Sequence, residues 1–374
     1  MKQLYTVPLK RSYDDNMSRC QVGPYNTERL LAFLNDLHQR LVPEQDQEGE
    51  NMRTFVITWD NVAFHHSQAI TTWFEVHPRL NVPDTNPAVP EPTSVQDLPN
   101  CEPTKESLYS LYELQGVLGR GSFGTVYRAI RKTDGRQFAI KRLCKWNNTR
   151  SIQIPGYSKP LPREVALMLM LRRPPVSPYV IQMYEWFDRR LVMSLVLEFP
   201  HPCMVLRKFI STSSALTERI TRGLMRQLVL AVQHCIDHGV FHNDIHADNI
   251  LVNTRTLGLK LIDFGAAHLV NSAGYDSWRY LGAVEFCPPE ALSMPKYYAV
   301  PTNVWSLGVV LYFMVNRQLP FTYAMQTLEG SINSFKSTVS TECRDLIGQC
   351  LNRIPEKRPT FNQILRHQWI QSES

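Results

Sequence analysis

Between residues 112 and 370, the spacing of apolar positions changes from strand-like to helix-like near residue 197. Between residues 112 and 197, apolar residues occur in short runs of strand length, interrupted by one helical pattern around Glu164. Beyond residue 197, apolar residues recur at helical spacing in residues 215–237, 303–315, 343–351 and 361–367. The pattern therefore predicts an α+β fold for residues 112–370, with a small β-rich lobe and a larger helical lobe. We expect the candidate active site to lie between the two lobes.

The first part of the chain has a different pattern. Its periodicity predicts helix, strand, helix and the start of a strand at residues 26–41, 54–59, 66–76 and 79–82. We interpret residues 1–82 as a partial β-α-β fragment. Prolines are dense in the stretch that follows, so residues 83–111 are predicted to form an extended linker, and the domain boundary is placed there.

Composition restricts the class of protein and its compartment. The 374 residues are 43% hydrophobic and 20% charged, and the net charge of +6 neither demands nor forbids nucleic acid. The eight cysteines form no Cys-x-x-Cys pair, which favours free thiols in a reducing compartment. No signal-peptide pattern opens the chain, and the longest apolar run, residues 304–315, is too short to span a bilayer. We expect a cytoplasmic or nuclear monomer with no membrane or nucleic-acid partner.

Candidate chemistry is concentrated in residues 242–265. The sequence His-Asn-Asp-Ile-His-Ala-Asp-Asn is followed by two short apolar segments and then by Asp-Phe-Gly. This places Asp244, Asn249 and Asp263 on two tight loops, where their oxygens suit a hard divalent cation and a carboxylate can receive a hydroxyl proton. The alternative is a pair of hairpin turns, which also favour Asp and Asn. The five-residue step from Asp244 to Asn249, with Asp-Phe-Gly fourteen residues later, favours the catalytic interpretation.

This stretch resembles the catalytic core of a eukaryotic protein kinase, and the other motifs of that family occur upstream in the expected order. Residues 118–126 read Leu-Gly-Arg-Gly-Ser-Phe-Gly-Thr-Val, a glycine loop that lets the backbone approach phosphates. Phe-Ala-Ile-Lys follows at strand spacing and ends at Lys141, and Glu164 lies in a helical pattern. The resemblance implies a bilobal protein kinase fold, with Lys141 on the α- and β-phosphates of ATP and Glu164 holding Lys141. Taken singly, Lys141 could be a solvated strand lysine and Glu164 a first-turn glutamate.

The same resemblance implies the rest of the nucleotide site. Asp244 would be the catalytic base, with Asn249 and Asp263 holding Mg²⁺. Val126, Ala139 and Leu251 would enclose the adenine ring, or else belong to the core. The full set implied for ATP is Leu118, Gly119, Arg120, Gly121, Ser122, Phe123, Gly124, Thr125, Val126, Ala139, Lys141, Leu197, Glu198 and Leu251. Glu290 and Arg358 resemble the pair that ties the activation segment of kinases to their helical lobe.

Residues 197–202, Leu-Glu-Phe-Pro-His-Pro, make the resemblance more specific. They are similar to the hinge of Pim kinases, in which proline removes one backbone N–H that most kinases offer to adenine. The resemblance covers residues 112–370. It implies an enzyme that transfers phosphate from ATP to Ser or Thr of protein substrates with Mg²⁺ and without obligatory activation-loop phosphorylation.

Three departures from the family pattern concern catalysis. Asn243 replaces an arginine that can pair with activation-loop phosphate, so gating through this residue is expected to be weak. His246 stands in place of a catalytic-loop lysine, and we expect a neutral imidazole at pH 7. Ala283 replaces the threonine whose hydroxyl joins that lysine at the catalytic Asp. The sequence thus favours a slow kinase with His246 as a catalytic residue, and a nucleotide-binding pseudokinase is the alternative.

Substrate preference is also expected to differ. Pim-like kinases favour arginine-rich sequences, which acidic residues after the hinge and in the catalytic loop recognise. Here the post-hinge stretch reads Val205-Leu-Arg-Lys208, and Ala247 occupies another position that is usually acidic, while Asp248 remains. Because basic residues repel a basic peptide, we expect a weakened preference for arginine.

A second resemblance concerns residues 20–82, which contain Gly-Pro-Tyr-Asn-Thr-Glu-Arg-Leu-Leu and Trp-Asp-Asn-Val-Ala-Phe-His-His. These words are similar to a mariner-like DDE transposase, whose RNase H-like fold holds two metals with three carboxylates. Asp60 matches the second carboxylate, and the first and third have no counterpart. One carboxylate cannot hold two metals. We therefore interpret this segment as a truncated remnant without nuclease activity, and a nuclease is the least favoured hypothesis.

Overall fold

The computed structural model describes residues 101–121, 124–145, 151–213, 216–323 and 325–372, together with strands β1 (Gln3–Leu4) and β2 (Gln21–Val22). The chain divides into two units, one made of residues 1–84 and 146–148 and the other of the remainder. In the first unit, β1 and β2 pair antiparallel. The predicted helix at 26–41, Asp60 and the RNase H-like fragment lie outside the described residues.

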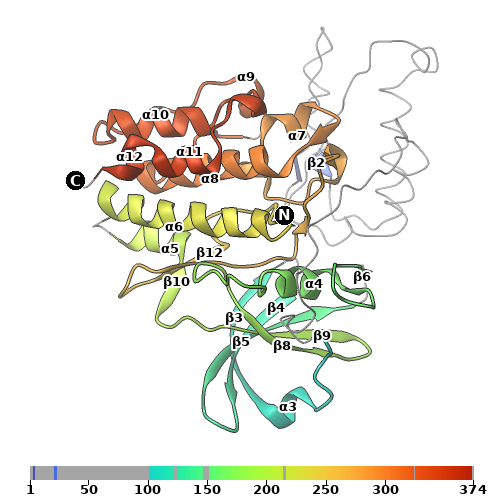
Figure 1. Ribbon diagram of the computed structural model, residues 1–374. Coiled ribbons are helices and arrows are strands. Elements are labelled where there is room, and N and C mark those ends of the chain that lie inside the picture. The colour runs from blue at the N-terminus through green and yellow to red at the C-terminus, as the bar shows by residue number, and fades with distance from the viewer. Residues whose placement is uncertain are drawn as a thin grey trace, which may run out of the picture. The chain divides into compact units, whose positions relative to one another are not determined.

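The small lobe of the second unit is built on one antiparallel sheet (Figure 1). Its strands lie in the order β3-β4-β5-β9-β8. Their bounds are β3 Tyr112–Gly121, β4 Gly124–Arg131, β5 Gln137–Cys144, β8 Met183–Asp188 and β9 Val192–Leu197. Helix α4 (Arg163–Met170) packs against the sheet, and β6 (Ser151–Ile152) pairs with β7 (Leu161–Pro162) beside it.

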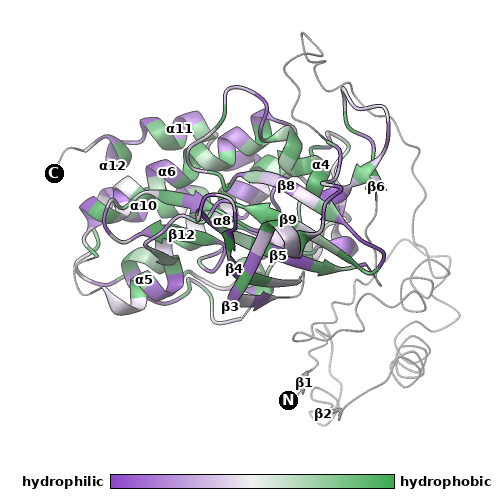
Figure 2. Ribbon diagram, turned by 90° about the horizontal axis from the view of Figure 1, so that it is seen from below, coloured by the Kyte–Doolittle hydropathy of each residue, from purple (hydrophilic) through white to green (hydrophobic). Residues whose placement is uncertain are grey.

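Apolar burial explains why these elements hold together. Every residue of α4 from Glu164 to Met170 is buried, and so are the four central residues of β9. Figure 2 accordingly colours α4 and β9 largely as hydrophobic. A separate cluster, which includes Tyr112, Phe138 and Phe187, covers the other side of the sheet with edge-to-face ring contacts. The sheet is therefore buried on both faces at its centre.

Residues 101–111, which the sequence analysis places in the linker, contact the small lobe. Thr104 N–H donates to Trp186 O (2.8 Å), and Trp186 Nε1 donates to Cys101 O (3.1 Å). The short helix α3 (Leu108–Leu111) follows, with Leu108 in the core beside Tyr112. Because β8 is an edge strand, this segment covers backbone groups that would otherwise be open to pairing.

The large lobe is helical, as the apolar spacing predicts (Figure 1). Its helices are α5 Leu206–Thr212, α6 Glu218–Asp237, α7 Pro289–Ser293, α8 Ala299–Asn316, α9 Gln326–Glu329, α10 Thr341–Cys350, α11 Phe361–Arg366 and α12 Gln368–Gln371. Helix α6 begins at Glu218 because Thr217 caps it, accepting from Ile220 N–H. The two-lobed α+β prediction for this part of the chain is confirmed.

Pairs of short strands flank the loops of the large lobe. Their bounds are β10 Cys203–Val205, β11 Val240–Phe241, β12 Ile250–Asn253, β13 Leu259–Leu261, β14 His268–Leu269, β15 Tyr275–Asp276 and β16 Lys296–Tyr297. Strand β12 pairs with both β10 and β13, β11 pairs with β14, and β15 pairs with β16. All these pairs are antiparallel, so each brings two loops of the chain to one place.

Helix α8 is the centre of the large lobe. Among the described helices it alone is long and apolar enough to cross a membrane by length and composition, and 83% of that window is buried inside the protein. It packs against α6 and α10, and Gly308 allows this contact because a Cβ there would meet Cys350 Cβ at 2.7 Å. Its apolar composition is thus accounted for by packing within the lobe.

Glu290 and Arg358 form the ion pair that the sequence suggests. Both Nη atoms of Arg358 lie 2.7 Å from Glu290 carboxylate oxygens, and both side chains are almost fully buried. Arg358 also donates to Asn352 O and Pro301 O, each at 2.8 Å, and lies over the Trp305 ring. The pair therefore joins α7 to α8 and to the loop before α11.

We predict that Arg358→Met lowers the free energy of unfolding by about 3–5 kcal/mol, because Glu290 is left as an unpaired buried charge. Urea denaturation followed by tryptophan fluorescence measures this loss. The double variant Glu290→Gln/Arg358→Met should lose less than Arg358→Met alone. Arg131→Met, which breaks the exposed pair with Asp134, should cost about 1 kcal/mol or less. Equal losses for Arg358→Met and Arg131→Met would contradict the assignment.

Candidate functional site

A buried lysine links two elements of the small lobe, β5 and α4, to the loop that follows β13. Lys141 lies within β5, Glu164 lies in the first turn of α4, and Asp263 follows β13. The Nζ of Lys141 is 2.6 Å from Glu164 Oε1 and 2.8 Å from Asp263 Oδ1. Burial disfavours the lysine charge, but the two carboxylates outweigh it, so the pKa of Lys141 is raised. Lys141, Glu164 and Asp263, which come from three separate motifs, thus form one charged network.

Asp263 belongs to the same balance of charge. Burial would raise the pKa of its carboxyl, but the charge and hydrogen bond of Lys141 lower it. Its Oδ1 also accepts from Gly265 N–H at 3.0 Å. The residue has φ 64°, a left-handed conformation that Asp tolerates better than most residues. Asp263 is therefore an anion fixed by its own turn.

Asp244 lies in the loop between β11 and β12, and its carboxylate is held from several sides. Oδ1 accepts from Ala283 N–H (2.8 Å), and Oδ2 accepts from Asn249 Nδ2 (2.9 Å). His246 Nε2 lies 3.3 Å from the same Oδ2. Asn249 Nδ2 also donates to Asp244 O, which closes the loop on itself. The carboxylate thus has a fixed direction.

This loop and the Asp-Phe-Gly segment are joined by a buried histidine. His242 Nε2 donates to Ile262 O (3.0 Å), and its ring meets Phe264 edge-on at 4.8 Å. Ile262 N–H in turn donates to Asn249 O at 2.9 Å. Asn249 and Asp263, which are far apart in the sequence, are thereby brought to the same place.

The residues present fit a magnesium ion, and Asn249 and Asp263 are the residues that would hold it. Asn249 Oδ1 and Asp263 Oδ2 have no hydrogen-bond donor in the described part of the chain. Nor does that part contain a group of three or more His, Cys, Asp or Glu side chains arranged for a metal. Two oxygen ligands suit Mg²⁺, which takes few protein ligands and completes its shell with phosphate oxygens and water.

The glycine loop is the turn between β3 and β4, and residues 122 and 123 lie outside the described residues. Gly124 has φ 137°, and a Cβ there would lie 2.3 Å from Arg142 O, so no other residue fits. Around Gly119 and Gly121, by contrast, no atom of the described residues lies within 4 Å of a Cβ position. The backbone between Leu118 and Gly121 is therefore accessible to a ligand.

The other nucleotide residues lie on strands near the connection between the lobes. Thr125 and Val126 pair with Arg142 and Lys141 across β4 and β5. Ala139 pairs with Leu197 across β5 and β9. Glu198 follows β9 and forms an ion pair with Lys260 (2.8 Å), while Leu251 pairs with Val205 in the large lobe. The predicted residues thus come from both lobes, and Arg120 is exposed on β3.

His246 lies between two carboxylates, with Nε2 3.3 Å from Asp244 Oδ2 and Nδ1 3.7 Å from Asp248 Oδ2. Burial disfavours the charged ring, but the hydrogen bonds and charges of both carboxylates prevail and raise the pKa of His246 to about 9. The expectation of a neutral imidazole at pH 7 considered residue type without these neighbours, which favour the charged ring. At higher pH, Nδ1 can accept from Asp248 N–H, which lies 3.3 Å away.

Asn243 is buried and has internal partners. Its Nδ2 donates to Ala266 O and its Oδ1 accepts from Tyr297 Oη, both at 3.4 Å. Like Asp263 it has a positive φ, here 63°, which Asn accommodates. Asn243 is thus held inside the protein by neutral partners, and weak phosphate gating through this residue stays a prediction.

Three contacts could not be predicted from the sequence. The Ala283 donor is a backbone N–H, which a motif search cannot detect. Arg163 Nη2 donates to Gly265 O (2.8 Å), linking the start of α4 to Asp-Phe-Gly. Arg207 Nε lies 2.7 Å from Asp248 Oδ2. The last two contacts span 102 and 41 residues, so they depend on the tertiary structure.

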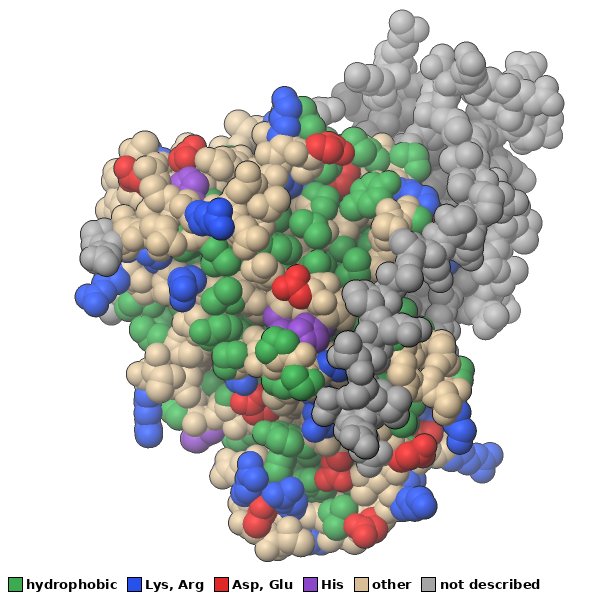
Figure 3. Space-filling model, viewed as in Figure 1, with side chains coloured by type: hydrophobic (Ala, Val, Ile, Leu, Met, Phe, Trp, Pro, Cys, Tyr) green, Lys and Arg blue, Asp and Glu red, His purple; other side chains and the backbone are tan. Residues whose placement is uncertain are grey.

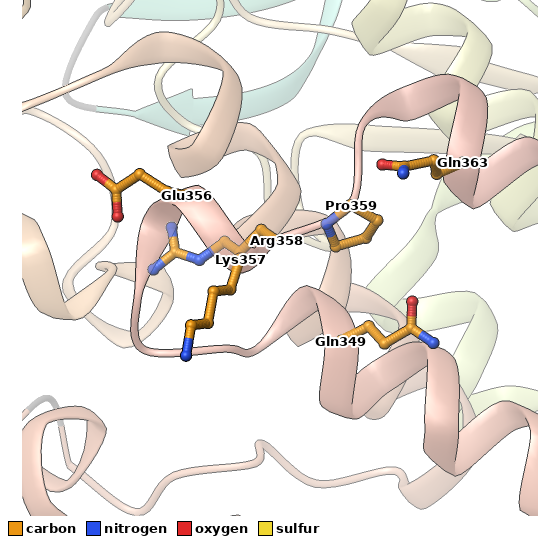
Figure 4. Close-up of a pocket in the computed structure, with 6 residues that line it drawn as sticks. All are labelled: Gln349, Glu356, Lys357, Arg358, Pro359 and Gln363. Carbon is orange, nitrogen blue, oxygen red and sulfur yellow. The ribbon is translucent and has the colours of Figure 1, made fainter.

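A depression elsewhere on the large lobe does not compete with this site. It has a volume of about 380 Å³ and is lined by Gln349, Glu356, Lys357, Arg358, Pro359 and Gln363 (Figure 4). None of these residues belongs to the catalytic or nucleotide set, and Arg358 uses its guanidinium on Glu290.

Comparison with known proteins agrees with this geometry. The protein kinase domain family matches residues 112–370. The chain is similar to the serine/threonine-protein kinase pim-2 of Danio rerio, at 36% identity over 72% of this chain and 88% of that protein. It is 33% identical to the kinase prk-2 of Caenorhabditis elegans over 70% of this chain and 59% of that protein. Human NUAK family SNF1-like kinase 1 is 31% identical over 71% of this chain and 39% of its own length.

We predict that Asp248→Asn lowers the pKa of His246 from about 9 toward the ordinary value of about 6.5, because one of its two carboxylate neighbours is lost. Side-chain NMR titration of the histidines measures this, with the resonance assigned by its absence in His246→Gln. Asp345→Asn, which removes the carboxylate beside His367, should leave His246 unchanged. A wild-type pKa near the ordinary value would contradict the assignment.

We also predict that Arg163→Met accelerates hydrogen–deuterium exchange in residues 263–267 by up to about tenfold, because a hydrogen bond to Gly265 O is lost. Mass spectrometry of peptic fragments measures it. Arg172 lies just after α4 and donates an exposed hydrogen bond to Tyr184 O. Arg172→Met removes this bond and is the matched control. Unchanged exchange in Arg163→Met would show that this contact does not hold the segment.

Proposed function

Because this chain belongs to the protein kinase family, we propose that it is an active serine/threonine kinase of Pim-like type. It would transfer the γ-phosphate of ATP to Ser or Thr hydroxyls of protein substrates. Similarity to pim-2 over most of that protein's length supports the subtype, as does the hinge at residues 197–202.

The observation that carries the proposal is the Lys141 network. Lys141 contacts Glu164 and Asp263 at 2.6 and 2.8 Å at the same time, so the lysine, the α4 glutamate and the Asp-Phe-Gly aspartate are already assembled. Phosphoryl transfer depends mainly on positioning and on charge, and both lysine and aspartate must be in place together. Lys141 would thus be ready to contact the phosphates.

Each side chain then has a defined role in the transfer. Asp244 would accept the proton of the substrate hydroxyl as its oxygen bonds to the γ-phosphorus, while the bond from that phosphorus to the bridging oxygen breaks and ADP leaves. The Ala283, Asn249 and His246 contacts keep the Asp244 carboxylate directed at the hydroxyl. Bound magnesium would supply neutralisation of phosphate charge, and Asn249 and Asp263 would hold it.

The substitutions at residues 246 and 283 support the alternative, a pseudokinase that binds nucleotide with little turnover. Two observations favour activity instead. Ala283 still donates a hydrogen bond to Asp244 through its backbone, and the carboxylates of Asp244 and Asp248 raise the pKa of His246 to about 9. Asp244 thus keeps a hydrogen-bond donor in place of the threonine hydroxyl and a basic side chain in place of the lysine.

For the remaining properties we propose a monomeric cytoplasmic or nuclear protein that acts on protein substrates. For residues 20–82 we propose a transposase-like remnant without nuclease activity, since Asp60 lacks its partner carboxylates in the sequence. The absence of DNA cleavage with manganese would agree with this.

We predict that the full-length protein transfers labelled phosphate from ATP to a protein substrate and that Asp244→Asn reduces the rate by at least about 100-fold. The reduction arises because an amide cannot accept the hydroxyl proton. Mg-ATP should raise the melting temperature of both proteins, which shows that the variant is folded and binds nucleotide. Equal background transfer by both proteins, with ATP binding retained, would contradict the proposal and favour the pseudokinase.

A further inference from the structure

The exposed edge beside the catalytic loop carries an arginine fixed in one orientation. Arg207 Nε donates to Asp248 Oδ2 at 2.7 Å, and its guanidinium lies over the Phe313 ring at 5.2 Å. Its backbone N–H donates to Ala247 O at 3.1 Å, so α5 is attached directly to the catalytic loop. Both charged side chains remain nearly half exposed. The arginine is therefore both ordered and accessible.

Arg207 retains most of its hydrogen-bonding capacity. Only Nε is used on Asp248, and neither Nη atom has an acceptor among the described residues. A guanidinium whose orientation is fixed and whose terminal nitrogens are open is suited to bind a carboxylate or phosphate. Lys208, the next residue, is exposed and forms no ion pair within the part of the chain that the structure describes. We call Arg207 and Lys208 the basic ledge.

The basic ledge is connected to the catalytic base by consecutive contacts. Arg207 contacts Asp248, Asp248 lies 3.7 Å from His246 Nδ1, and His246 Nε2 lies 3.3 Å from Asp244. A polypeptide that presents a hydroxyl to Asp244 therefore passes close to the ledge.

The same contacts remove the site at which a basic substrate residue would bind. Ala247 occupies a position that is usually acidic, so Asp248 is the acidic residue that remains beside it. Arg207 already neutralises the Asp248 carboxylate. An arginine of a substrate would have to displace Arg207 and would be repelled by Lys208.

We propose that the basic ledge selects substrates with an acidic side chain, a carboxylate or a phosphate, close to the Ser or Thr that is phosphorylated. Arg207 binds this group through its free Nη atoms, and Lys208 adds charge. The ledge is a specificity determinant and takes no part in phosphate transfer itself. This inference rests on the proposed kinase function, which it extends to a class of substrate.

The test uses the full-length protein and peptides with one serine acceptor in a neutral sequence. A single Glu, phosphoserine or Arg is placed in turn at each position within about five residues of the acceptor, and kcat/KM is measured. The Glu and phosphoserine arms distinguish the two sources of negative charge. We expect the best acidic peptide to exceed the neutral peptide by on the order of tenfold, mainly through KM, as for partly exposed charged hydrogen bonds.

Variants assign the preference to the ledge. Arg207→Ala and Lys208→Ala should each lose most of the gain in kcat/KM that the acidic peptide shows over the neutral peptide. Arg226→Glu alters an exposed arginine on α6 that has no ion pair among the described residues, and it should retain the preference. Selection of the arginine peptide over the acidic one, or an acidic preference that survives in Arg207→Ala, overturns the proposal.

A binding measurement separates this proposal from the proposed activity. The same peptides, labelled with a fluorophore, are titrated with the protein in the presence of magnesium and a non-hydrolysable ATP analogue. If no peptide is phosphorylated but the acidic peptide binds more tightly, and Arg207→Ala removes the difference, the kinase proposal fails and the ledge stands. If acidic peptides bind no better than neutral ones, the ledge proposal fails whatever the activity.

Discussion

The buried charge of Lys141 is the interaction on which the rest of the site depends. An ammonium group in the interior is stable only with paired carboxylates, and here it has two, one from α4 and one from the loop after β13. Because the three charges need each other, the position of α4 on the sheet and the position of the Asp-Phe-Gly segment are coupled. Arg163 adds a second link between the same two elements through Gly265 O. The small lobe and the inter-lobe loop therefore hold one arrangement.

The catalytic loop shows that a role can be preserved while the chemical group changes. In this chain a histidine replaces a lysine and an alanine replaces a threonine, and both replacements weaken the site if side chains are compared one by one. The structure supplies a backbone N–H from Ala283, and it supplies a histidine whose pKa is about 9 because two carboxylates flank it. The carboxylate of Asp244 is thus supported by hydrogen-bond donors on both oxygens.

The activation segment is anchored by aromatic packing as well as by the ion pair of Glu290 and Arg358. Tyr275 and Tyr297 lie on the paired strands β15 and β16 and pack against Phe241 and Tyr280. Tyr297 reaches Asn243 through its hydroxyl. Further out, exposed apolar residues Trp278, Val284, Met294 and Tyr298 belong to the same region, and hydrophobic side chains gather near α7 on the face shown in Figure 3. An aromatic cluster under the segment thus reaches the loop residue where the family has a phosphate-pairing arginine.

The sequence by itself determined the two-lobed α+β fold of residues 112–370 and the order of the motifs. These follow from short-range rules, since apolar periodicity sets element type and the sterics of positive φ restrict Gly124 to glycine and favour Asn243 and Asp263. Tertiary structure alone decided the charge of His246, the donor supplied by Ala283, and the pairing of Arg163 with Gly265 and of Arg207 with Asp248. Each of these depends on which groups from distant segments surround a residue and on how far water is excluded from it, and neither quantity is encoded by the residue's own type or spacing.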